Sequence, residues 1–119
     1  MYLIGKINNK CLALKKLETI KERKKGFMGW EQSPNNEFGL LFYNLKPKIQ
    51  SYWMHTVPFD LQALGFDERN NLIEIINLKS FEKTSKYFSQ PVCHVVEVCK
   101  DWCEKNNIDL GSKLIIKKL

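Results

Sequence analysis

The chain has 119 residues, of which 44% are hydrophobic and 27% are charged. This ordinary globular composition argues against intrinsic disorder, and the length fits a single domain over residues 1–119. No stretch approaches the roughly 20 apolar residues that a membrane-spanning helix needs, and residues 1–10 lack the apolar core of an export signal. We therefore expect a cytoplasmic protein without membrane contact, or one in the host cytoplasm or virion if a phage encodes it.

The formal net charge of +6 is concentrated in the first half of the chain. Residues 1–60 hold ten Lys/Arg against five Asp/Glu, whereas the later residues hold nine against eight. A basic surface attracts phosphate groups or acidic partners. Nucleic acid is therefore one candidate partner, but it ranks behind a protein partner or a homo-oligomer, because only the charge points to it.

The first part of the chain predicts a β-hairpin and then a short helix. Runs of β-forming residues at 2–7 and 11–17 flank an Asn-Asn turn. Thr19 and Glu22 have the spacing of a capping box, in which each side chain accepts a hydrogen bond from the backbone N–H of the other residue. A short basic helix therefore follows and ends at Gly26.

The middle of the chain predicts strands separated by turns. Clusters of Pro, Gly, Asn and Asp interrupt short apolar runs, and Pro is rare within a strand. The predicted strands span residues 39–43, 51–55, 60–66 and 72–78, and the polar residues 79–90 form a long loop.

The clearest strand of the sequence is the run at 92–99. Both of its faces are largely apolar, which indicates a central strand of a sheet. A helical turn at 101–106 and a final strand at 113–117 follow it. Many short strands at close spacing, with one or two short helices, predict a mainly β fold, either a sandwich or a compact barrel.

Seven short motifs follow one another from about residue 19 to residue 116. They are Arg23-x-x-Gly26-Phe27-Met28, Gly39-Leu40-Leu41-Phe42, Tyr52-Trp53-Met54-His55-Thr56, Pro58-Phe59-Asp60, Phe66-Asp67, Val95-Val96-Glu97-Val98 and Gly111-Ser112. Their order resembles the domain of unknown function 192 (DUF192) family of uncharacterised bacterial, archaeal and phage proteins. The resemblance implies a β-rich fold of jelly-roll type. It implies no reaction, because none is established for that family.

The sequence departs from the family pattern at several positions. Phe27 stands where the family usually has Leu, and Leu40 stands where it usually has Met. Ser112 replaces the usual Asp, and the segment 53–60 is shorter than the common form.

Glu97 and Arg23 are the first pair of candidate functional residues. Glu97 lies in the middle of an apolar strand, where a lone carboxylate is costly. We favour a structural salt bridge in which Arg23 supplies a two-pronged hydrogen-bonded partner. The alternatives are a ligand-binding or catalytic carboxylate, and an exposed Glu97 without a role.

An aromatic cluster around Trp53 is the second candidate. Aromatic and Met side chains at this spacing are typical of a core or a pocket wall. His55 and Asp60 could form the imidazole–carboxylate pair of acid–base chemistry, although a buried, hydrogen-bonded His55 is the more common arrangement. We expect an interaction surface near Trp30, Phe42, Trp53 and His55.

The cysteines and histidines do not predict a metal site. Cys93 and His94 are adjacent, so a strand points them to opposite faces, and Cys99 lies about 20 Å further along. We interpret Cys93, Cys99 and Cys103 as core residues. The sequence has no Gly-rich phosphate loop, nucleophile elbow or paired metal carboxylates, so we expect no cofactor, no metal and no catalytic residue.

Three functions remain as hypotheses. The first is a non-enzymatic binding or interaction module of unknown ligand, with a ligand or partner surface formed by Arg23, Trp30, Phe42, Trp53, His55, Asp60 and Glu97. The second is a structural or accessory subunit of a larger assembly such as a phage particle. The third is a small hydrolase-like enzyme, which requires at least two of His55, Asp60 and Glu97 in one pocket.

Overall fold

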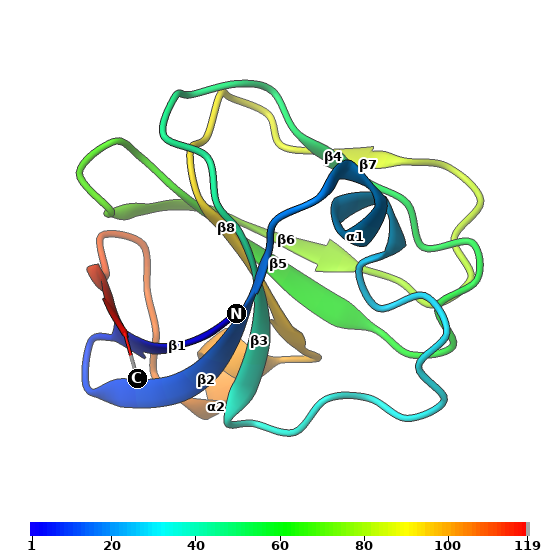
Figure 1. The fold of residues 1–119 in the computed structure, drawn as a ribbon, viewed down its shortest axis with the longest axis horizontal. Helices are drawn as coiled ribbons and strands as arrows, with labels where there is room; N and C mark the ends of the chain where they lie inside the picture. The colour runs from blue at the N-terminus through cyan, green and yellow to red at the C-terminus, as the bar shows by residue number, and fades with distance from the viewer. Residues whose placement is uncertain (119) are drawn as a thin grey trace.

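The computed structural model describes residues 1–118 and is mainly β (Figure 1). Its strands are β1 (Tyr2–Ile7), β2 (Lys10–Leu17), β3 (Phe38–Phe42), β4 (Ser51–Tyr52), β5 (Leu61–Phe66), β6 (Leu72–Leu78), β7 (Lys86–Tyr87), β8 (Val95–Cys99) and β9 (Leu114–Lys118). The two short helices are α1 (Ile20–Lys25) and α2 (Trp102–Lys105). The predicted fold class, a compact mainly β fold with one or two short helices, is confirmed.

Seven of the strands form one strongly curled sheet in the order β6-β5-β8-β3-β2-β1-β9. All neighbours are antiparallel except β2 and β3, which are parallel because α1 and a long loop connect them. The curl brings the two edges of the sheet together at one end, where Asn71 and Lys113 form an isolated bridge. The sheet is therefore a half-barrel that closes at one end.

The central strands are buried on both faces by two separate apolar clusters. Every residue of β5 and β8 is buried. Val96 and Val98 belong to a cluster that α2 completes with the fully buried Trp102. Val95 belongs to the cluster on the other side, which contains Phe27. The prediction that 92–99 includes a central strand is confirmed, although regular pairing begins only at Val95.

The predicted strand at 51–55 is wrong beyond Tyr52. The chain turns after β4, where the Val57 N–H donates a hydrogen bond to the Met54 carbonyl at 3.0 Å. β4 pairs instead with β7, which lies within the predicted loop at 79–90, and the two form a separate two-stranded sheet.

Three of the four cysteines are core residues, as predicted. Cys93, Cys99 and Cys103 are buried and Cys11 is exposed, and all four carry free thiols. Burial raises the pKa of the Cys103 thiol to about 12. Within residues 1–118, the structure contains no group of three or more His, Cys, Asp or Glu side chains placed to hold a metal. In the same range no helix has the length and apolar character to span a membrane.

Helix α1 begins with the predicted capping box. The Glu22 N–H donates to Thr19 Oγ1 at 3.0 Å, and the Thr19 N–H donates to Glu22 Oε1 at 3.0 Å. The helix ends at Gly26, whose positive φ of 48° suits glycine. None of its six residues is buried, so its ends hold it in place more than its packing does.

Replacing Thr19 by Ala removes the hydroxyl half of the capping box. We expect the free energy of unfolding to fall by about 1 kcal/mol, the usual cost of losing an N-cap side chain. Urea unfolding measures it, with Thr56→Ala as the matched control, because Thr56 is exposed and lies outside the helices and strands. Equal losses in the two variants would contradict a stabilising role for the cap.

Candidate ligand cavity

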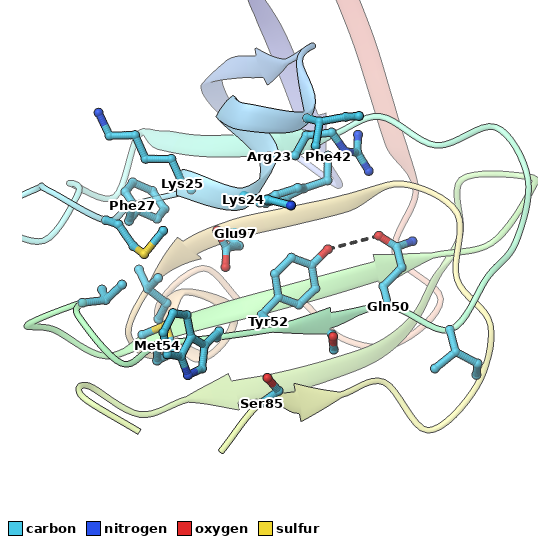
Figure 2. Close-up of a pocket in the computed structure, with 18 of the residues that line it drawn as sticks. Arg23, Lys24, Lys25, Phe27, Phe42, Gln50, Tyr52, Met54, Ser85 and Glu97 are labelled. Carbon is cyan, nitrogen blue, oxygen red and sulfur yellow. Dashed lines mark hydrogen bonds between the residues drawn. The ribbon is translucent and has the colours of Figure 1, made fainter. Parts of the chain in front are cut away.

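A cavity of about 680 Å³ lies between α1, the segment 48–54 and the face of β8 that carries Glu97 (Figure 2). Its size falls within the range of small-molecule sites in proteins. Its lining residues are Ile20, Arg23, Lys24, Lys25, Gly26, Phe27, Met28, Phe42, Lys48, Ile49, Gln50, Ser51, Tyr52, Trp53, Met54, Val57, Leu61, Ser85 and Glu97.

The carboxyl group of Glu97 forms part of the cavity wall beneath α1. Val96 and Val98 point toward the apolar cluster that contains Trp102. Because side chains alternate between the two faces of a strand, Glu97 points to the opposite face, toward the cavity. Its neighbours across the sheet are Leu40 and Ala63, which offer no polar side chain. The residue is 4% exposed, and burial raises the pKa of its carboxyl to about 8, so the carboxyl is mostly protonated at neutral pH.

The predicted salt bridge between Arg23 and Glu97 is not formed. The Arg23 guanidinium donates instead to the Tyr43 carbonyl at 3.3 Å and to Asn44 Oδ1 at 2.6 Å, and it lies over the Phe42 ring at 5.8 Å. The chain beyond β3 supplies these acceptors, and they satisfy the guanidinium.

The Glu97 carboxyl has no partner among residues 1–118. The ion pairs found there involve other residues. No fully enclosed side-chain oxygen or nitrogen in that range lacks a hydrogen bond. The unpaired carboxyl oxygens of Glu97 are therefore open to the cavity.

The hydroxyl of Tyr52 is held by a polar network at one side of the cavity. It donates to Gln50 Oε1 at 3.2 Å, as Figure 2 shows. Gln50 in turn donates to the carbonyls of Val92 and Cys93 at 2.9 and 2.8 Å. Burial, with a smaller contribution from Glu97, raises the pKa of Tyr52 well above its usual value of 10, so the hydroxyl stays neutral.

The remaining walls of the cavity are apolar inside and basic outside. The buried apolar side chains are Phe27, Phe42, Met54, Val57 and Leu61. The cations are Arg23, Lys24 and Lys25 from α1 and Lys48 from the loop before β4. Three large apolar side chains at the same cavity, Ile20, Ile49 and Trp53, are more than half exposed. The apolar walls and the basic rim together are complementary to an amphipathic ligand.

Four of the seven predicted site residues line this cavity, namely Arg23, Phe42, Trp53 and Glu97. The other three lie outside it. Trp30 stacks on Phe38 with ring centroids 5.5 Å apart. His55 is exposed and stacks on Trp53 with ring centroids 5.2 Å apart, so the expectation of a buried histidine is wrong.

Asp60 has a structural role in the loop before β5. Its Oδ1 accepts a hydrogen bond from the Ser80 N–H at 2.7 Å, and Lys100 lies 3.9 Å from its Oδ2. His55 and Asp60 form no hydrogen bond with each other, and neither lies with Glu97 in the cavity. The acid–base constellation that the enzyme hypothesis requires is therefore absent from residues 1–118.

The sequence did not single out several residues that complete the cavity. Tyr52 and Phe27 stand inside the family motifs, so the motif pattern could have indicated them. Gln50 carries no such signal, because its role depends on carbonyls more than 40 residues away.

One protein-family model matches almost the whole chain. The model of DUF192, whose description is "Uncharacterized ACR", matches residues 3–116. No curated protein matches the chain.

Two solved structures have the same fold. A proposed transcription regulator from Sinorhizobium meliloti superimposes with a TM-score of 0.89 at 16% identity, covering 98% of this chain and 94% of that chain. A protein of unknown function from Novosphingobium aromaticivorans gives a TM-score of 0.81 at 18% identity, covering 96% and 83% of the two chains. At these identities the likeness shows the fold alone.

Replacing Glu97 by Gln should flatten the dependence of stability on pH. Between pH 4.5 and about 8 the carboxyl is ionised in the unfolded chain but protonated in the folded protein, because burial raises its folded pKa to about 8. The folded state therefore binds more protons, and the free energy of unfolding falls by about 1.4 kcal/mol per pH unit as the pH rises. Between pH 5 and pH 8 the original protein should lose roughly 4 kcal/mol relative to Glu97→Gln.

Chemical unfolding of both proteins at pH 5 and pH 8 makes this measurement. Other titrating groups are common to both proteins and cancel in the difference. Parallel losses in the two proteins would show that Glu97 ionises normally in the folded state.

Proposed function

The chain belongs to the DUF192 family, and we propose that it is a non-enzymatic binding module whose ligand is a small molecule held in the Glu97 cavity. The observation that carries this proposal is the unpaired Glu97 carboxyl, which is 4% exposed and open to a cavity of about 680 Å³. The carboxyl oxygens reach the cavity and have no protein partner among residues 1–118, so they can form hydrogen bonds with a ligand held there.

The shape and the lining of the cavity support a small molecule as the ligand. Binding sites of this kind are concave, mostly apolar and furnished with a few polar groups that orient the ligand. The Glu97 carboxyl and the Tyr52 hydroxyl are such groups, since both face the cavity from secondary-structure elements. Ile20, Ile49 and Trp53 supply exposed apolar surface at the cavity for the ligand to cover.

The arrangement favours binding over catalysis. The enzyme hypothesis requires at least two of His55, Asp60 and Glu97 in one pocket. Of the three residues considered for an enzyme, the cavity contains only Glu97, whereas His55 and Asp60 lie outside it. The second hypothesis, a structural or accessory subunit of a larger assembly, stays a prediction from the sequence.

A bulky side chain placed in the cavity should block binding. Ser85 lines the cavity and is only partly buried, so Ser85→Trp can fill the space without disturbing the core. A fluorescence titration with the neutral apolar dye N-phenyl-1-naphthylamine should show one saturable site in the original protein. We expect at least tenfold weaker binding by Ser85→Trp.

Ser89→Trp is the matched control, because Ser89 is exposed and lies outside the cavity. It should bind the dye like the original protein. Absence of a saturable site in the original protein, or unchanged binding by Ser85→Trp, would contradict the proposed function.

A further inference from the structure

The charges around the cavity are almost all of one sign. Arg23, Lys24, Lys25 and Lys48 line it, and Glu97 is the single acidic residue among its lining side chains. Since burial keeps the carboxyl mostly protonated at neutral pH, the lining is strongly positive there. Lys24, Lys25 and Lys48 are exposed, so solvent and salt weaken their repulsion of a cation without changing its sign. The cavity therefore disfavours a cationic ligand and favours an anionic one.

The polar groups inside the cavity can serve an oxyanion. A protonated carboxyl at Glu97 donates one hydrogen bond, and the Tyr52 hydroxyl donates a second one if it turns from Gln50. Hydrogen bonds to a charged acceptor are about twice as strong as neutral ones. Glu97 also lies close to the end of α1, because a methyl group at Gly26 would stand 3.5 Å from Glu97 Oε1. The helix that carries three of the cations is thus directly above the carboxyl.

The apolar walls require an apolar body on the same ligand. Met54, Val57 and Leu61 carry no polar group that a fully hydrophilic ligand could use, and Ile20, Ile49 and Trp53 expose apolar surface at the same cavity. A simple inorganic anion would leave this exposed apolar surface uncovered, whereas an aliphatic or aromatic body would remove it from water.

From these observations we infer that the occupant of the cavity is an organic acid with an apolar body, whose acidic group lies beside Glu97 and Tyr52 under the cations of α1. This inference rests on the proposed binding function and names the ligand class of the same site. Acids of this class occur as free metabolites and as lipid-derived chains, and both share the chemistry that the cavity recognises.

Three probes with the same apolar chain separate the possible charges of the ligand. Octanoate, 1-octanol and octylamine are used at pH 7 to displace N-phenyl-1-naphthylamine from the full chain. Octanoate should bind at least tenfold more tightly than octylamine, a difference of about 1.4 kcal/mol, with octanol between them. If octylamine binds most tightly, the inference is overturned and Glu97 is assigned to an amine. If the dye itself does not bind the protein, the result contradicts the proposed binding function instead.

The pH dependence of octanoate binding tests the role of Glu97. Ionisation of the carboxyl places a negative charge beside the bound acid, so affinity should fall about tenfold between pH 7 and pH 9, given a pKa of about 8. Glu97→Gln keeps a hydrogen-bond donor without the charge and should change by less than about twofold over this range. The variant also carries every other titrating group that faces the site, namely Arg23, Lys24, Lys25, Lys48 and Tyr52. Equal losses in the two proteins would overturn the assignment of Glu97.

Two neighbouring lysines of α1 provide a matched comparison for the basic side of the cavity. Lys24 lines the cavity and Lys21 does not, and both are exposed. Lys24→Gln should weaken octanoate binding about threefold or more and leave octanol binding unchanged, whereas Lys21→Gln should affect neither. Equal effects of the two substitutions on octanoate would place the acidic group outside the cavity. A comparison of two further acids distinguishes the two sources of the ligand. Phenylbutyrate resembles free aromatic acids and laurate resembles lipid-derived chains, and the acid with the higher affinity indicates the source.

Discussion

The burial of one carboxyl at the centre of the sheet constrains the rest of the site. Strand β8 lies between β3 and β5, and every residue of β8 is buried. Strand alternation leaves Glu97 on the same side as Val95, in a position where a charged carboxylate would cost several kcal/mol. Burial therefore raises the pKa of this carboxyl to about 8, so the side chain is mostly protonated in the folded protein near neutral pH.

The helix above Glu97 explains why a cavity exists there. Helix α1 has no buried residue, and its capping box and the Gly26 turn fix its two ends. Arg23 also ties it to Tyr43 and Asn44 beyond β3. A helix with an apolar face would pack into the space and fill it. This short basic helix spans the space instead, so it positions cations over the cavity without closing it.

Much of the fold could be predicted because its signals are local. The hairpin of β1 and β2, the capping box at Thr19 and the central run that contains β8 each follow from neighbouring residues. The prediction for 51–55 was wrong because Val57 and Met54 close a turn, and aromatic residues alone do not reveal it. The pairing of β4 with β7 is likewise a contact between distant segments.

The candidate site was only partly predictable for the same reason. The sequence marked Glu97 as a costly carboxylate in an apolar strand, and the structure agrees on its burial. It could not identify the partner of Arg23, because Asn44 lies 21 residues away and only the fold shows that it lies beside the guanidinium. His55 and Asp60 looked like a pair in sequence, but the turn at Met54–Val57 separates an exposed ring from a carboxylate that holds Ser80.

The choice of partner for Arg23 has a consequence for function. An ion pair with Glu97 would have satisfied both residues within the protein and left no polar group for a ligand. Because Tyr43 and Asn44 occupy the guanidinium, the carboxyl stays without a partner among residues 1–118, and its raised pKa of about 8 shows that burial disfavours its charged form. Proteins retain such local costs mainly where function needs them. The unpaired carboxyl, the open apolar space and the cations above it therefore form the single site that we propose for a ligand.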